Sequence, residues 1–257
     1  MIIDPAAVVV LTLLGLAVGS FLNVCIHRLP RRQSLVSPPS RCPHCGYQLR
    51  AVDNIPVVSY VLLRARCRRC RTRISMRYPL VELITMGLFL LHYAVFDWTP
   101  LLAVRLLFAC AMVVLFAIDL EHQLLPDVVT LPGIAAGLAC SLFLPPGLLW
   151  ALLGAVVGGG VLFLIAEIWS RLRHVEAMGF GDVKMLAMIG AFLGVKLVML
   201  TFVLSSFIGG LAGGLLILSG RGSMASKVPF GTFLAAAALV ASLWGDAIVA
   251  WYVGWYA

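Results

Sequence analysis

Charged residues are scarce in this chain. Only 12% of its 257 residues are Asp, Glu, Lys or Arg, whereas 62% are hydrophobic and the mean hydropathy is +1.04. Soluble domains are about one-quarter charged, so this composition excludes an ordinary soluble globular protein. A membrane-spanning helix needs about 20 apolar residues, and the chain supplies such runs several times. We therefore predict an all-α polytopic membrane protein.

Eight apolar segments are expected to form transmembrane helices. They are residues 5–24, 79–97, 100–118, 128–145, 148–169, 184–194, 197–219 and 229–251. The first segment lacks the marks of a cleaved secretory signal, because no basic residue precedes it and no A-x-A site follows it. We interpret it as a retained helix. The sixth segment is unusually short for a membrane span.

Basic residues are concentrated in one polar segment, residues 25–78. It holds twelve of the nineteen Lys and Arg residues and a single acid, Asp53. The positive-inside rule predicts that this segment is cytosolic and that both termini lie outside. We expect three parts: a first transmembrane helix (1–24), a cytosolic loop (25–78) and a membrane core (79–257). The net charge of +8 then reflects topology and contact with anionic membrane lipids.

Four cysteines stand in two C-x-x-C pairs within the basic loop. They are Cys42, Cys45, Cys67 and Cys70. This spacing is typical of a structural zinc site with four sulfur ligands, and the reducing cytosol disfavours disulfides. The alternative is a set of free thiols. Arginine-rich zinc ribbons also bind nucleic acid, but a loop held between two membrane spans is poorly placed for it, so we expect no nucleic-acid partner.

Two acids are predicted to lie at cytosolic ends of spans. Asp119 ends an apolar run shortly before Pro126, and Asp182 follows Gly179 and Gly181 at the start of the short span. Two close carboxylates tend to share one proton. One of them can then activate water while the other donates a proton to a carbonyl oxygen. The residues alone leave open whether the acids form a functional pair or are unrelated interfacial caps.

The residues around Asp182 suggest further roles. Gly179 and Gly181 are expected to adopt backbone conformations barred to other residues and to let a substrate strand approach closely. The short span is expected to place the site below the membrane surface. Lys184 has two interpretations, an interfacial cation that snorkels to water or an electrostatic neighbour that keeps one carboxylate ionised.

The chain resembles a known family, the type IV prepilin peptidases, which are membrane aspartic proteases of the GxGD class. The motifs that carry the resemblance are GSFLNVCIHRLP, CPHCGYQLRAVDNIPVVSY, CRRC, ISMRYPLVELIT, AIDLEHQLLPD, MGFGDVKML and VPFGTFLA. The resemblance implies a bacterial inner-membrane enzyme that removes the basic leader of type IV prepilins and secretion pseudopilins on the cytosolic side. It also implies methylation of the new N-terminal residue, usually Phe, with S-adenosylmethionine.

The same resemblance assigns Asp119 and Asp182 as the catalytic aspartates, with Asp127 as the rival for the first role. Glu82 becomes a candidate for the methyl-donor site, or else a helix cap, since no G-x-G-x-x-G fingerprint is present. The family usually has a Gly-x pair before the third cysteine, where this chain has Ala65 and Arg66. If that glycine is needed, methylation is expected to be weaker while proteolysis survives.

The basic leader is expected to meet acidic residues, because the loop arginines would repel it. The candidates are Asp53, Glu82, Glu121 and Glu176. Two alternatives belong to other classes of protein. A proton-coupled transporter would show internal repeats and acids near the midplane, and a non-enzymatic scaffold of a secretion system would leave the GFGD sequence unexplained.

Overall fold

The computed structural model describes residues 4–173, 179–219 and 229–255, and these residues form helices and no β-strand. The predicted all-helical class is thereby confirmed. The chain divides into two compact units, Met1–Val114 and Leu115–Ala257. The boundary falls within helix α4 (Pro100–His122). Each unit is described by itself below.

The first unit is built on two long apolar helices, α1 (Pro5–Arg28) and α3 (Arg77–Phe96). Asp4 starts α1, because its carboxylate accepts a hydrogen bond from the Ala6 N–H over 2.9 Å. A buried apolar cluster joins α1, α3 and the start of α4, and it contains Ala7, Leu11, Phe89, Tyr93 and Leu102. Between α1 and α3 runs the cysteine loop, with the short helices η1 (Leu29–Arg31), η2 (Ala51–Asn54) and α2 (Val58–Leu62).

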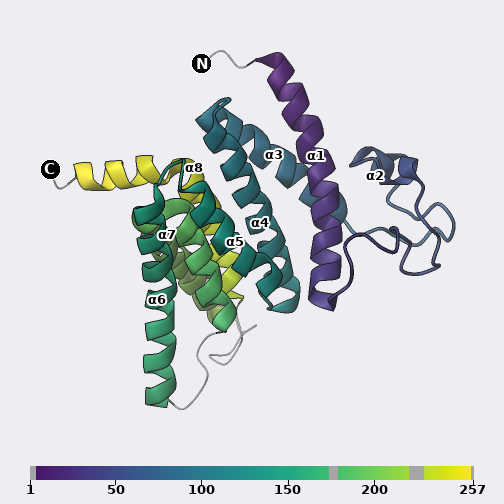
Figure 1. Cartoon of the computed structure of the whole chain (residues 1–257). Helices are drawn as coiled ribbons and strands as arrows, with labels where there is room; N and C mark the ends of the chain where they lie inside the picture. The colour runs from purple at the N-terminus through teal and green to yellow at the C-terminus, as the bar shows by residue number, and fades with distance from the viewer. Residues whose placement is uncertain (1–3, 174–178, 220–228, 256–257) are drawn as a thin grey trace. The chain divides into compact units, whose positions relative to one another are not determined.

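The second unit contains α5 (Asp127–Cys140), α6 (Leu148–Arg173), α7 (Phe180–Leu218) and α8 (Phe230–Gly254), after the end of α4. Helices α6 and α7 lie side by side (Figure 1). They meet where Gly154 faces Gly190, and a β-carbon on either glycine would collide with the backbone of the other helix. Small residues allow this close packing in membrane helices.

Helix α7 reverses direction at Gly194. This residue has φ 78° and ψ 176°, a conformation that is nearly restricted to glycine and cannot continue a helix. A β-carbon placed on Gly158 of α6 would lie 2.7 Å from the Leu186 carbonyl oxygen and 2.9 Å from the Val198 side chain. Twelve residues of straight helix would separate Leu186 from Val198 by about 18 Å. The two parts of α7 therefore fold back as a hairpin.

The helix count agrees with the expected segments once α7 is divided. Six described helices are long and apolar enough to cross a membrane, and α5 is a shorter apolar helix of 14 residues. The expected short span 184–194 is the first part of α7, and the expected span 197–219 is the second. Helix α5 ends at Cys140 instead of the expected 145, since turns follow it. At 1.5 Å per residue α5 is about 21 Å long, less than a hydrocarbon core.

Candidate active site and metal centre

A cavity of about 200 Å³ in the second unit brings the predicted acids together. It is lined by Asp119, Gln123, Leu124, Leu125, Asp127, Gly179, Gly181 and Asp182. These residues come from the end of α4, the following turn, the start of α5 and the start of α7. Residues far apart in sequence thus share one small space at helix ends.

Asp119 is buried and firmly held. Its side chain is at the end of α4 and the residue is 5% exposed. The backbone N–H of Thr232 donates a hydrogen bond to Oδ2 of Asp119 over 2.6 Å, and the Thr232 hydroxyl donates to the same oxygen over 3.0 Å. Thr232 is itself buried in the first turn of α8. Both bonds reach one oxygen, so the carboxylate has one bound and one available oxygen.

Asp182 lies in the first turn of α7 and is partly buried. The prediction that its neighbouring glycines take special backbone conformations is wrong. Gly179 has φ −70° and ψ 140°, which any residue adopts, and Gly181 is helical. Gly181 instead provides space, because a β-carbon there would lie 2.9 Å from Cβ of Leu125. A β-carbon on Gly179 would meet no atom closer than 3.9 Å.

Lys184 contacts Asp127 at the cavity. Its Nζ donates hydrogen bonds to Oδ1 and Oδ2 of Asp127 over 2.7 and 2.8 Å. The pair links the start of α5 to the start of α7, and the Asp127 side chain is 55% exposed. Lys184 is therefore neither a snorkelling cation alone nor a direct partner of Asp119 or Asp182.

The roles of Thr232 and Gly231 cannot be read from the sequence. Thr232 stands 113 residues from Asp119, in the motif VPFGTFLA, whose function was not assigned. A β-carbon on Gly231 would lie 3.0 Å from Asp119 Oδ2 and 3.0 Å from Leu125 Cδ1. Leu125 thus packs against the first turns of both α7 and α8. Only the folded chain reveals this support.

The four loop cysteines form one cluster in the first unit. All four Sγ atoms lie within 4.8 Å of one another, with Cys42 and Cys70 3.8 Å apart and Cys45 and Cys67 4.0 Å apart. Tetrahedral ligands at about 2.3 Å from zinc place sulfurs about 3.8 Å apart. The cluster can bind a metal ion.

The two cysteine pairs are closed by matching backbone turns. Gly46 N–H donates to Cys42 O over 2.9 Å, and Arg71 N–H donates to Cys67 O over 3.1 Å. Gly46 and Arg71 both have left-handed backbones, with φ 68° and 60°. Each turn presents two sulfurs to the same point. The repeated geometry explains why the spacing alone predicted the cluster.

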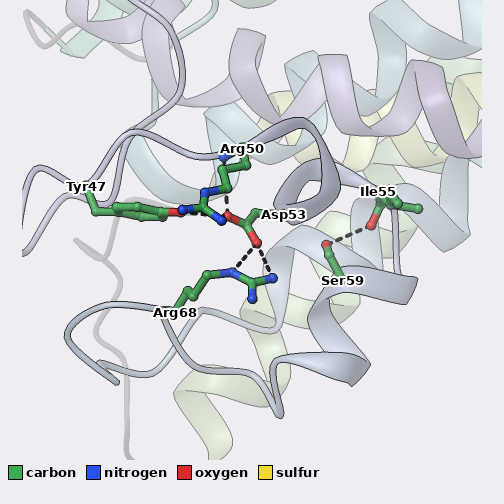
Figure 2. A network of polar contacts seen from close by, with 6 residues as sticks. All are labelled: Tyr47, Arg50, Asp53, Ile55, Ser59 and Arg68. Atoms are coloured by element: carbon green, nitrogen blue, oxygen red, sulfur yellow. Dashed lines mark hydrogen bonds and ion pairs between the residues drawn. The ribbon is translucent and has the colours of Figure 1, made fainter.

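Asp53 joins separate segments of the cysteine loop through contacts with Tyr47, Arg50 and Arg68 (Figure 2). Its Oδ1 accepts from the guanidinium of Arg68, with Nε at 2.7 Å and Nη2 at 2.6 Å. Its Oδ2 accepts from the Tyr47 hydroxyl over 3.2 Å and the Arg50 N–H over 3.3 Å. The Arg68 hydrogen bond holds the pKa of the Asp53 carboxyl below its usual range. This buried acid is occupied by structural contacts, which disfavours it as a leader contact.

Glu82 anchors the loop to α3. The residue is buried, and its Oε2 accepts a hydrogen bond from the Val57 N–H over 2.7 Å. Ser20 of α1 hydrogen-bonds to the same side chain. Val57 has φ 59°, which is unusual for a β-branched residue and requires support from its surroundings. These contacts favour a structural role for Glu82 over a methyl-donor site. Glu176, another predicted leader contact, lies outside the described residues.

Fold and site together define a class: a multi-pass, all-helical membrane protein with aspartates gathered at a cavity between helix ends and a four-cysteine loop. Comparisons with known proteins then identify the family. Residues 13–96 match the Bacterial Peptidase A24 N-terminal domain, and residues 106–214 match the Type IV leader peptidase family. The chain belongs to the type IV leader peptidase family and is an enzyme, which confirms the resemblance seen in the sequence.

Curated relatives cover almost the whole chain. The prepilin leader peptidase/N-methyltransferase of Stutzerimonas stutzeri is 40% identical, over 97% of this chain and 95% of its own length. The protein of the same name from Pseudomonas aeruginosa is 39% identical, over 97% and 94%. That of Aeromonas hydrophila is 40% identical, over 94% and 92%. No solved structure matches significantly.

Proposed function

We propose that this protein removes the basic leader of type IV prepilins and pseudopilins at the cytosolic face of the bacterial inner membrane, and methylates the new N-terminus. The names of its relatives support both activities. The observation that carries the peptidase half is the cavity lined by Asp119 and Asp182. Two neighbouring carboxyl groups and a water molecule suffice for peptide hydrolysis without a covalent intermediate.

The proposed reaction moves two protons and one water molecule. One aspartate takes a proton from water, whose oxygen bonds to the scissile carbonyl carbon, while the other aspartate protonates the carbonyl oxygen. The resulting gem-diol then collapses. The C–N bond breaks, the amine nitrogen takes the proton held by the first aspartate, and a diol hydroxyl returns a proton to the second. The products are a leader carboxylic acid and a free amine, and both aspartates regain their starting states.

The lengths of the helices support a site below the membrane surface. Asp127 and Asp182 stand at the starts of α5 and of the first part of α7, residues 180–193. Each of these segments has 14 residues and is about 21 Å long, shorter than the hydrocarbon core of about 30 Å. A cavity at their starts would admit water and the extended backbone just before the apolar helix of a prepilin.

The proposed topology places the cysteine loop in the cytosol and both termini outside. The positive-inside rule supports this orientation, since twelve basic residues and one acid lie between residues 25 and 78. The hairpin at Gly194 supports an even number of crossings. Membrane lipids are then direct partners of the exposed apolar faces.

The metal of the cysteine cluster is proposed to be zinc in a structural role. Four thiolates with sulfur spacings of 3.8 and 4.0 Å fit a closed tetrahedral shell. Cys42, Cys45, Cys67 and Cys70 would hold the ion, which would join the two turns of the loop. A closed shell leaves no position for substrate, so the zinc takes no part in either reaction.

Methylation would use S-adenosylmethionine, which supplies the methyl group to the amine that cleavage releases. Glu82 does not fit the donor site, because its buried carboxylate is occupied by Val57 and Ser20. Its proposed role is to hold the loop on α3.

The decisive experiment uses full-length enzyme in detergent, a prepilin and S-adenosylmethionine, with mass spectrometry of the product N-terminus. Asp119→Asn and Asp182→Asn should each lower the cleavage rate by about 10²- to 10⁴-fold. Asp127→Asn is the matched control, because it removes a carboxylate at the same cavity, and it should change the rate by only about threefold. An added methyl mass reports the second activity. Normal cleavage by both dyad variants would defeat the peptidase proposal and favour a transporter or a scaffold.

A further inference from the structure

The two proposed catalytic aspartates have unequal surroundings. Oδ2 of Asp119 receives two hydrogen bonds from Thr232, at 2.6 and 3.0 Å. Thr232 lies in the first turn of α8, where free N–H groups and the positive end of the helix dipole favour an anion. Among the residues that the structure describes, no hydrogen bond reaches the carboxyl group of Asp182. Asp119 is therefore the better stabilised carboxylate.

Helix ends alone would favour the opposite assignment. Asp182 lies in the first turn of its own helix, and Asp119 lies near the end of α4, so the fields of these helices favour an ionised Asp182. Such fields are weak beside direct hydrogen bonds. A hydrogen bond to a charged group changes an equilibrium by about tenfold or more, and Asp119 receives two of them. The hydrogen bonds therefore decide the charge.

We propose that Thr232 is a positioning residue that keeps Asp119 ionised and oriented, so that Asp119 accepts the proton of the attacking water and Asp182 carries the proton for the carbonyl oxygen. This inference rests on the proposed peptidase function and assigns its two roles. Because Thr232 occupies Oδ2, the oxygen available to water is Oδ1 of Asp119. Gly231 contributes by leaving space, since a β-carbon there would lie 3.0 Å from Oδ2.

Among the residues that the structure describes, the other ionisable groups near the pair belong to the cavity lining, α4 and α7. Asp182 and Asp127 are the other ionisable residues that line the cavity, and Lys184 neutralises Asp127. The first turn of α8, through Phe230, Gly231 and Thr232, brings no charged side chain. Glu121 and His122, on α4 itself, are exposed. In the described part of the chain, Asp119 is thus supported by the neutral donors of Thr232, and the neighbouring Lys184 is paired with Asp127.

The reaction then has fixed roles. Asp119 Oδ1 takes a proton from water, the water oxygen bonds to the carbonyl carbon, and the Asp182 proton passes to the carbonyl oxygen. When the C–N bond breaks, the amine nitrogen receives the proton from Asp119, and Asp182 recovers one from a diol hydroxyl. Asp119 is again ionised and Asp182 is again protonated, so no further reactant is needed.

The test compares Thr232→Val with Thr232→Ser in full-length enzyme, measuring kcat, KM and their pH dependence with a prepilin peptide. Valine keeps the shape and the backbone N–H but removes the hydroxyl. It should lower kcat by about 10- to 100-fold, leave KM within about threefold, and move the acidic limb of the kcat profile to higher pH. Serine keeps the donor and should retain the wild-type profile with kcat within about threefold.

Folding is checked in the same samples by thermal unfolding followed by circular dichroism, and Thr232→Ala serves as a second variant if valine does not fold. Thr232→Val or Thr232→Ala with the wild-type kcat and pH profile would overturn the inference. A lower kcat with an unchanged pH profile would overturn it too, because Thr232 would then only support the fold. Failure of the wild type to cleave the peptide would instead defeat the proposed function.

Discussion

The cysteine loop and the aspartate cavity are assembled in different ways. Each cysteine pair is closed by a turn within five residues, such as the Gly46 N–H to Cys42 O bond. The cavity joins α4, α5 and α7, and its Asp119 is held by Thr232 of α8, 113 residues away. A site made of local turns can be predicted from spacing, and one made at helix ends depends on packing that no short motif encodes.

The largest expected effect is the loss of zinc from the cysteine loop when one cysteine is replaced. Cys67→Ser replaces a thiolate by a hydroxyl that binds zinc poorly, and structural zinc sites supply much of the folding energy of small loops. We expect loss of the bound zinc, measured per mole of purified protein by elemental analysis. Cys25→Ser is the matched control, since Cys25 is a buried cysteine of α1 outside the cluster. Full zinc content in Cys67→Ser would contradict the four-cysteine assignment.

The next prediction concerns the cavity alone and compares alanine substitutions at its two glycines, Gly179 and Gly181. Gly181→Ala places a β-carbon 2.9 Å from Cβ of Leu125. Such overpacking lowers the free energy of unfolding by about 1–3 kcal/mol. We expect a lower melting temperature and a cleavage rate reduced about tenfold as Leu125 moves. Gly179→Ala meets nothing closer than 3.9 Å and should behave like the wild type. Equal losses in both variants would show that backbone freedom, not space, is required.

These glycines show where sequence reasoning reached its limit. Counting spans predicted that Asp119 and Asp182 lie on the same side of the membrane, and both residues line one cavity. The reason for Gly181 was wrong, because the contact partner, Leu125, lies on another segment. Thr232 was missed for the same reason. The helices themselves were predicted well, since apolar length determines them, whereas the reversal at Gly194 required the backbone angles.

A smaller effect is expected at Asp53, which stabilises the loop without binding metal. Arg68→Gln removes the partner at 2.6 Å from Asp53 Oδ1 and leaves a buried carboxylate with weaker donors. Because Arg68 is half-exposed, solvent screening should keep the loss of stability small. The loop should unfold at a lower temperature. Unfolding is measured by the fluorescence of Tyr47 and Tyr60 in a variant that lacks tryptophan.

The pH dependence of that cost has a definite sign. The Arg68 hydrogen bond lowers the pKa of Asp53, so its stabilisation is complete above the unfolded value of about 3.9. It is lost only as pH falls through the lowered folded pKa. The difference between wild type and Arg68→Gln should therefore stay constant from about pH 8 to 5. A difference that disappears within this range would contradict the ion pair.

The smallest prediction concerns Ala65, which lies two residues before Cys67. Ala65 has φ 56°, a left-handed conformation that costs a residue with a β-carbon about 1–2 kcal/mol. Ala65→Gly should therefore stabilise the loop by about 1 kcal/mol, after the flexibility of glycine in the unfolded chain is counted. A chelator should therefore remove zinc several-fold more slowly from Ala65→Gly than from the wild type.

The neighbouring residue supplies the control. Arg66 pairs with Arg73 in an isolated bridge and is absent from the left-handed positions among the described residues. Arg66→Gly should therefore gain nothing and lose about 0.5–1 kcal/mol through the flexibility of glycine. If both variants released zinc faster than the wild type, strain at Ala65 would not limit the loop. If only Ala65→Gly released it more slowly and also methylated faster, the geometry of this turn would connect the metal site to the second activity.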